Sequence, residues 1–194
     1  MRVIVLNRKR IGVTLIILGL MMILFVAESG VDHRLKMTAL MQNGIESLKE
    51  YKIDSGNIKY KLPSDWTTSE KKFSGGEILY HNDFTSSDNK IHGFVEKWKL
   101  EEDLKTFLIN SKKSAFNPES IKNYDVTPIK IKNYSAYLLT YDTKTSSNSY
   151  YRTYEYFIDQ NKSFFRMSFS VQQSDLKENM PAIFEYLANT YEIS

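Results

Sequence analysis

Residues 150–172 read YYRTYEYFIDQNKSFFRMSFSVQ, and this stretch decides the fold. Its second half alternates between two sets of side chains, which is the period of a β-strand. One set is Phe165, Met167, Phe169 and Val171, and the opposite set is Phe164, Arg166, Ser168 and Ser170. Residues 160–162 separate this run from a second strand-like run at 150–159, so the stretch predicts an antiparallel hairpin.

Bulky aromatic residues stand side by side in both halves of this hairpin, at Tyr150-Tyr151 and at Phe164-Phe165. Because successive side chains of a strand point to opposite faces, these pairs predict a sheet that is covered on both faces. On the facing strands, Glu155 and Arg166 predict a cross-strand ion pair.

Similar patterns extend outward along the chain. Alternation predicts further strands at residues 57–62, 77–81, 91–100, 126–132 and 134–142. Pro128 interrupts one of them, which predicts an edge strand or a β-bulge. Helical spacing returns at 101–114 and after Asn179, where Pro181 fits only a first turn. Short links between consecutive strands, with helices over the sheet, indicate an α+β domain with an antiparallel sheet.

The start of the chain combines basic residues with an apolar run. Residues 11–27 (IGVTLIILGLMMILFVA) carry no charge and would form a helix about 25 Å long. The basic residues lie only on the N-terminal side, which predicts cytoplasmic residues 1–10, a transmembrane signal anchor at 11–27 and an extracytoplasmic remainder. Two other interpretations stay open. One is a cleaved signal peptide, which Phe25 disfavours, and the other is a buried core helix.

Residues 28–55 are predicted as a helical stalk or linker. Its apolar residues recur at helical spacings, at Met37, Met41, Ile45 and Leu48. This face could pack on the domain, pair with another copy or lie along the membrane. The turn signal DSGN at 54–57 predicts that the extracytoplasmic domain covers residues 56–194.

Charge and composition exclude several classes of function. Four of the 26 basic residues lie in the first ten residues, which leaves 22 basic residues against 23 acidic ones in the rest. Nucleic-acid binding is not expected, because it needs positive charge on the folded domain. The chain has no Cys, so disulfides and thiolate chemistry are excluded. It also lacks G-x-S-x-G, H-E-x-x-H and glycine-rich phosphate loops, and we expect no cofactor.

One group of residues has metal-binding chemistry. His81 and Asp83 lie on one side of the loop at 82–90, and Asp88 and His92 lie on the other. If the flanking strands form a hairpin, two imidazoles and two carboxylates could meet at its mouth and bind Zn²⁺ or another divalent ion. The alternative is that the histidines are ordinary strand residues and that the aspartates solubilise the loop.

Tyrosines form a second candidate site. Tyr150, Tyr154 and Tyr156 belong to an aromatic-rich meander, and an exposed face of such residues could bind a glycan or a protein partner. Helices that cover both faces of the sheet would instead bury them.

The stretch YKLPSDW at 60–66, the Tyr-rich meander and the terminal helix at 181–191 resemble the PsbP-like family. More closely, residues 57–194 are similar to the membrane-anchored PsbP-related proteins of low-GC Gram-positive bacteria. The resemblance implies an α/β/α sandwich around a central antiparallel sheet. It also implies a non-catalytic accessory or binding module.

The sequence therefore predicts a single-pass protein of the cell membrane, with a non-catalytic extracytoplasmic binding module that acts through an envelope protein partner. Two alternatives remain: a metal-dependent envelope hydrolase that uses His81 and His92, and an envelope protein that binds a solute or glycan in a Tyr-lined pocket.

Overall fold

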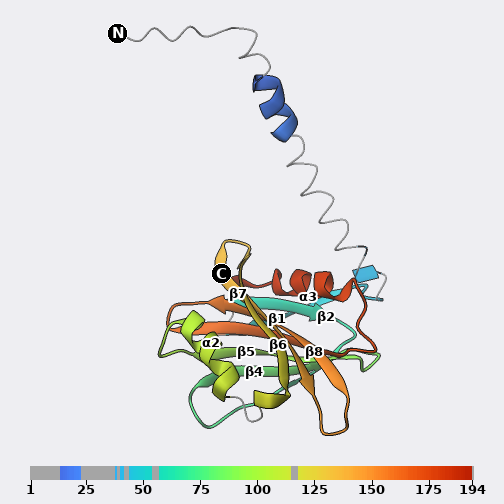
Figure 1. Cartoon of the computed structure of the whole chain (residues 1–194), viewed down its shortest axis with the longest axis vertical. Helices are drawn as coiled ribbons and strands as arrows, with labels where there is room; N and C mark the ends of the chain where they lie inside the picture. Colours follow the sequence, from blue (N-terminus) through green and yellow to red (C-terminus); the bar gives the residue numbers. More distant parts are fainter. Residues whose placement is uncertain are drawn as a thin grey trace.

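The computed structural model describes residues 14–22, 38, 40–41, 44–53, 57–114 and 118–193. Two antiparallel sheets and the helices against them build the domain, and the α+β class is confirmed (Figure 1). The smaller sheet has the order β1 (Leu48–Ile53), β2 (Ile58–Pro63), β10 (Glu192–Ile193).

The larger sheet has seven strands, each antiparallel to its neighbours. In spatial order they are β3 (Thr67–Glu70), β4 (Ile78–Thr85), β5 (Ile91–Lys99), β9 (Ser163–Gln172), β8 (Tyr150–Asp159), β7 (Tyr134–Lys144) and β6 (Ile121–Ile131). The predicted hairpin forms the centre of this sheet as β8 and β9. Pro128 lies in β6 at the sheet edge, as predicted, and the β6–β7 register shifts between Lys122 and Asp125.

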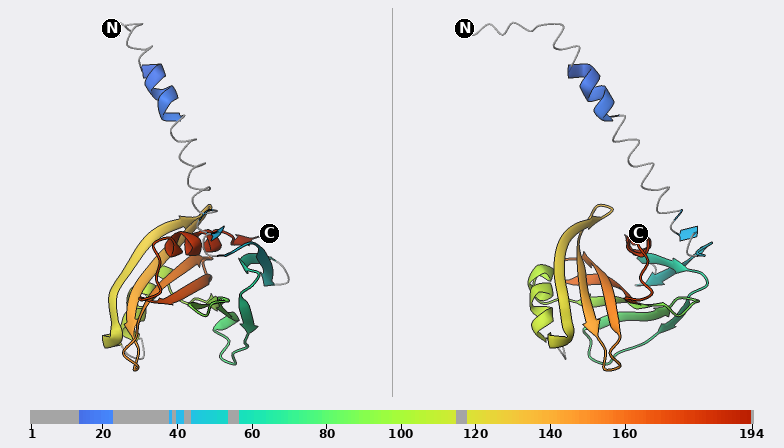
Figure 2. Two further views of the ribbon diagram at one scale, coloured as in Figure 1. Left: turned by 90° about the vertical axis from the view of Figure 1, so that its right-hand side faces the viewer. Right: turned by 45° about the vertical axis from the view of Figure 1, so that its right-hand side comes forward.

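Helices lie on opposite sides of the large sheet, as Figure 2 shows. Helix α2 (Leu104–Ser114) covers one face, and the short 3-10 helix η2 (Pro118–Ser120) leads from it into β6. Helix α3 (Met180–Ala188) covers the other face, next to the small sheet. Asn179 is its N-cap and Pro181 stands in its first turn, as the sequence predicts.

Each face of the large sheet has its own hydrophobic core. Under α3 the core takes one set of β9 side chains, Phe165, Met167, Phe169 and Val171. Under α2 it takes Phe164 from the opposite set, with Leu104 and Leu108 of the helix. The strict alternation in β9 thus follows from burial on both sides.

The structure corrects the predicted stalk. Residues 48–53 form β1 instead of the end of a helix, so the folded domain begins before residue 56. Pairing with β2 overrides the helical spacing, and Tyr51 stacks on Tyr60 with ring centroids 5.2 Å apart. Ile45 is buried in the core, whereas Met41 of the same predicted face is exposed. Met37 lies outside the described residues.

Part of the apolar N-terminal run is helical, at residues 14–22. The large apolar side chains of this helix are between 51% and 74% exposed. Among the described residues, no helix has both the length and the hydropathy needed to cross a membrane. The predicted cytoplasmic residues 1–10 and the two ends of the apolar run, 11–13 and 23–27, lie outside the described residues.

Candidate functional site

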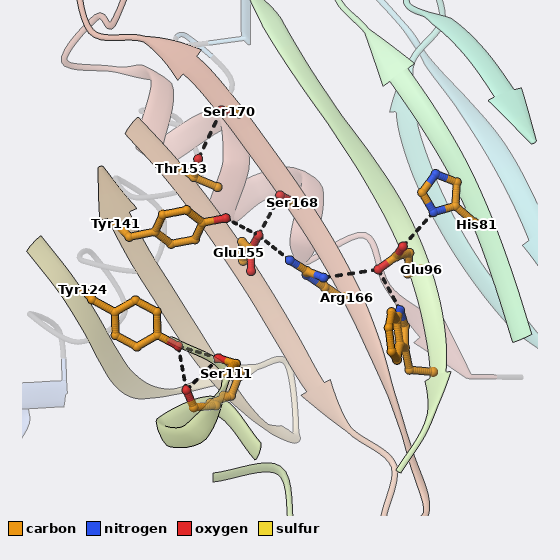
Figure 3. A network of polar contacts seen from close by, with 12 residues as sticks. His81, Glu96, Ser111, Tyr124, Tyr141, Thr153, Glu155, Arg166, Ser168 and Ser170 are labelled. Carbon is orange, nitrogen blue, oxygen red and sulfur yellow. Dashed lines mark hydrogen bonds and ion pairs between the residues drawn. The ribbon is translucent and has the colours of Figure 1, made fainter. Parts of the chain in front are cut away.

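A row of charged side chains crosses four strands on the α2 face of the large sheet. The register sets His81 of β4 opposite Glu96 of β5, and Glu96 opposite Arg166 of β9. Glu155 of β8 lies one step further along the row (Figure 3). We call His81, Glu96, Arg166 and Glu155 the charged row. Because strand pairing fixes each Cα, these four residues hold their positions without any loop.

Arg166 links two buried carboxylates. Its Nη2 donates to Glu155 Oε1 at 2.6 Å, and its Nη1 donates to Glu96 Oε2 at 3.3 Å. Glu155 is 1% exposed and Glu96 is 5% exposed. The hydroxyls of Tyr141 and Ser168 also donate to Glu155 Oε1, at 3.0 Å and 3.1 Å. Buried carboxylates are stable only when they are paired and hydrogen-bonded, as Glu96 and Glu155 are here.

His81 bridges two carboxylates. Its Nδ1 lies 2.7 Å from Glu96 Oε1 and its Nε2 lies 2.8 Å from Asp83 Oδ1. Burial alone would raise the pKa of Asp83, but hydrogen bonds from Lys71 and His81 outweigh it and lower that pKa, so Asp83 is ionised. Both ring nitrogens of His81 are therefore engaged with carboxylate oxygens. Neither nitrogen is free in this arrangement to bind a metal ion or to accept a substrate proton.

Aromatic rings fill the spaces between these charges. Phe94 stacks on His81 with centroids 5.6 Å apart, and Phe73 meets His81 edge-on at 5.1 Å. The Arg166 guanidinium lies over Phe94 at 4.6 Å and over Phe157 at 5.2 Å. These cation–π contacts add to the ion pairs and hold Arg166 in one orientation.

Two cavities meet at Phe107 of α2. One, of about 470 Å³, lies at the end of β5 and is bounded by Trp98 and Leu100. The other, of about 180 Å³, lies between α2 and the sheet and reaches Glu155 and Arg166. Glu155 and Arg166 of the charged row thus border the smaller cavity.

The predicted metal ligands do not converge. His92 lies opposite Thr85 and contacts its Oγ1 at 3.3 Å, four residues along the hairpin from His81. At about 3.3 Å per residue, the backbone positions of His81 and His92 are about 13 Å apart along the hairpin. Asp88 accepts from Ser86 Oγ at 2.7 Å inside the loop. Across the described ranges, no three His, Asp or Glu residues are placed to hold a metal ion.

The predicted tyrosine site is divided between burial and exposure. Tyr156 is buried, and Tyr154 packs against Phe184 of α3 with centroids 5.5 Å apart. Tyr150 is 40% exposed at the start of β8, where Lys144 lies 5.5 Å from its ring centroid. Two of the three candidates therefore serve the core under α3.

Sequence reasoning found the Glu155–Arg166 pair but missed the link to Glu96 and Trp98. The indole Nε1 of Trp98 donates to Glu96 Oε2 at 2.7 Å. The alternation in 91–100 already sets Glu96 and Trp98 on one face of β5. The pairing of β5 with β9 could not be predicted, because these strands lie more than sixty residues apart in sequence. Without this pairing, the contact between Glu96 and Arg166 could not be predicted either.

Taken together, the two sheets, the covering helices and the central β8–β9 hairpin define a PsbP-like fold. Cyanobacterial PsbP (CyanoP) from Synechocystis sp. PCC 6803 is similar in structure, with a TM-score of 0.58 and 13% sequence identity over 77% of this chain and 94% of that protein. A protein from Bacteroides thetaiotaomicron matches with a TM-score of 0.49 and 16% identity, over 75% of this chain and 48% of that one.

LpqN, described as involved in cell envelope biogenesis of Mycobacterium tuberculosis, matches with a TM-score of 0.47 and 10% identity over 76% of this chain and 91% of that protein. No protein-family model matches the sequence, and no curated protein is similar to it in sequence.

Proposed function

We propose that this chain is a non-catalytic binding module, held outside the cytoplasm by a single membrane anchor and acting through an envelope protein partner. The observation that carries the proposal is the helix at residues 14–22, whose large apolar side chains are all more than half exposed. A helix that is apolar all round needs an apolar surrounding, and a bilayer supplies one.

The sequence around this helix supports the same topology. It lies within the uncharged run 11–27, which is near the lower limit for a membrane span. All basic residues of the first 27 precede the run, at Arg2, Arg8, Lys9 and Arg10. Positive-inside asymmetry then directs the domain outward.

The charged row supports a binding role more than a catalytic one. A general base needs a lone pair within reach of a substrate proton. Both nitrogens of His81 face carboxylates, and Glu155 already accepts from three donors. These groups stabilise the sheet, so the module would act by binding, and its partner would be in the envelope that holds the anchor.

Membrane fractionation tests the anchor. The full chain should sediment with membranes and resist alkaline extraction, and protease added outside intact protoplasts should digest the domain. The double variant Leu18→Lys/Leu20→Lys should release the chain from the membrane, because each central Lys costs about 2.5–3.5 kcal/mol of insertion.

The matched control is Ile109→Lys/Leu79→Lys, which changes two exposed apolar residues of the domain. This control should stay in the membrane fraction. A wild-type chain that is soluble, or a domain that external protease spares until lysis, would overturn the proposed topology.

The partner is tested by cross-linking on intact cells, where the anchored chain should give a defined adduct that the released variant lacks.

A further inference from the structure

The larger of the two cavities lies outside the charged row and has a chemistry of its own. It opens where α2 begins beside the end of β5, and its volume is about 470 Å³. This is within the range of small-molecule sites, about 300–1,000 Å³. Trp98, Leu100 and Phe107 supply its apolar walls, and Glu77, Glu101, Glu102 and Lys99 supply its charges.

The aromatic walls are fixed in place. Trp98 stacks on the buried ring of Phe164 with centroids 6.1 Å apart and planes 9° apart. Phe107 packs against the same ring at 5.3 Å. The hydrogen bond from the Trp98 indole to Glu96 sets the rotation of the indole. A wall that is ordered before binding costs a ligand little entropy.

The cations of the described chain already cover other rings but not these two. Lys or Arg side chains lie over Tyr51, Phe94, Tyr150, Tyr154 and Phe157. No such contact is present at Trp98 or Phe107 within the described ranges. The two rings that line the cavity are therefore not covered by a cation of the described residues.

The carboxylates of the cavity are also without an ion-pair partner among the described residues. Both acids of the charged row have a basic partner, since Glu96 and Glu155 share Arg166. The neighbouring Asp83 pairs with Lys71 and His81. By contrast, Glu77, Glu101 and Glu102 form no ion pair in the part of the chain that the structure describes, and they outnumber Lys99. The cavity therefore has an excess of negative charge beside open aromatic rings.

We propose that this cavity binds the ammonium group of a small organic amine. An indole and a phenyl ring attract a cation through their quadrupoles, and carboxylates at the same opening add Coulomb attraction. A neutral ligand of the same shape would gain only the apolar contact. The inference goes beyond the anchor and partner proposed above, and it stands on the cavity alone.

Titration of the detergent-solubilised full chain tests it, with heat and Trp fluorescence as readouts. The probes are choline, which is a quaternary ammonium, cadaverine, which is a primary diamine, and 3,3-dimethylbutan-1-ol, which is a neutral isostere of choline. At least one amine should bind saturably at about one per chain, and the alcohol should bind at least about tenfold more weakly. The amine with the higher affinity shows whether the cavity prefers a quaternary or a primary ammonium group.

A pair of matched variants locates the site. Glu101→Gln/Glu102→Gln should weaken amine binding about tenfold, because two exposed charge interactions with the ammonium group are lost. Glu46→Gln/Glu178→Gln removes two exposed carboxylates elsewhere and should leave the affinity unchanged. Equal binding of the alcohol, no saturable binding of either amine, or equal losses in both double variants would each overturn the proposal. None of these outcomes bears on the membrane anchor, which fractionation tests separately.

Discussion

Arg166 lies diagonally across the β8–β9 ladder from Glu155, and the 2.6 Å hydrogen bond between them joins a guanidinium to a carboxylate that is 1% exposed. An exposed cross-strand pair contributes little, but a buried one behaves differently, because breaking it leaves a charge without solvent or partner. Here the loss of Arg166 would leave two buried carboxylates without their guanidinium partner, since Arg166 also donates to Glu96.

Replacing Arg166 with Met should therefore lower the free energy of unfolding by about 3–5 kcal/mol. The matched control is Lys52→Met, which breaks the exposed Lys52–Glu50 pair and should cost less than about 1 kcal/mol. Urea denaturation of both variants measures the difference. A loss of under about 1 kcal/mol for Arg166→Met would show that the buried pairs do not stabilise the sheet.

The two histidines of the β4–β5 hairpin should differ sharply. His81→Ala should cost about 1–3 kcal/mol, because it leaves oxygens of Glu96 and Asp83 without their hydrogen-bond partner. His92→Ala should stay within about 0.5 kcal/mol, since His92 is exposed at the end of the hairpin. Added Zn²⁺ should not raise the melting temperature of the wild type. A rise that both substitutions abolish would restore the metal site that the sequence predicts.

Alkaline pH should destabilise the protein through Tyr60. Burial raises the pKa of Tyr60 from 10.0 to about 12, although hydrogen bonds with Tyr80 and Asn82 lower it in part. The neutral phenol is favoured in the folded state, so its contribution is complete below pH 10 and is lost as the pH rises to about 12.

Unfolding measured across that window should show Tyr60→Phe losing less stability with pH than the wild type, by about 2–3 kcal/mol. Identical slopes for wild type and Tyr60→Phe would contradict the assignment.

Gly93 marks a close approach between β5 and its neighbours. A Cβ at this position would lie 1.9 Å from the backbone oxygen of Ser168 and 2.5 Å from Cζ of Phe84. Gly93→Ala should therefore destabilise the sheet by about 2–3 kcal/mol or more, because the backbone of β9 cannot give way without breaking the ladder. Gly75→Ala, which meets open space, should be nearly neutral. Thermal unfolding of the two variants compares them, and similar melting temperatures would argue against this packing.

Local sequence patterns were enough to predict much of the fold. The alternation of β9 predicts both its strand and its two-sided burial, and the pairing of Glu155 with Arg166 follows from the hairpin. Strand β1 could not be predicted in the same way. Its residues have helical spacing with those before them. Only the ladder to β2, with the stacking of Tyr51 on Tyr60, makes this segment a strand.

The candidate sites were harder to predict for a related reason. His81 and His92 flank a predicted loop, but β4 continues to Thr85, and the longer ladder separates the imidazoles. The cavity beside Trp98 depends on where α2 begins relative to β5, which no local pattern encodes. Side chains that share a strand were predictable, whereas spaces between elements were not.

The small sheet has a mechanical consequence. Strand β2 pairs with β1 on one side and with β10 on the other, so both ends of the domain are fastened to one strand. A pull from the N-terminal side reaches β1 first, and β1 is an edge strand whose backbone ladder is with β2. Such a pull therefore acts on the six paired residues of the β1–β2 ladder before it reaches the seven-stranded sheet.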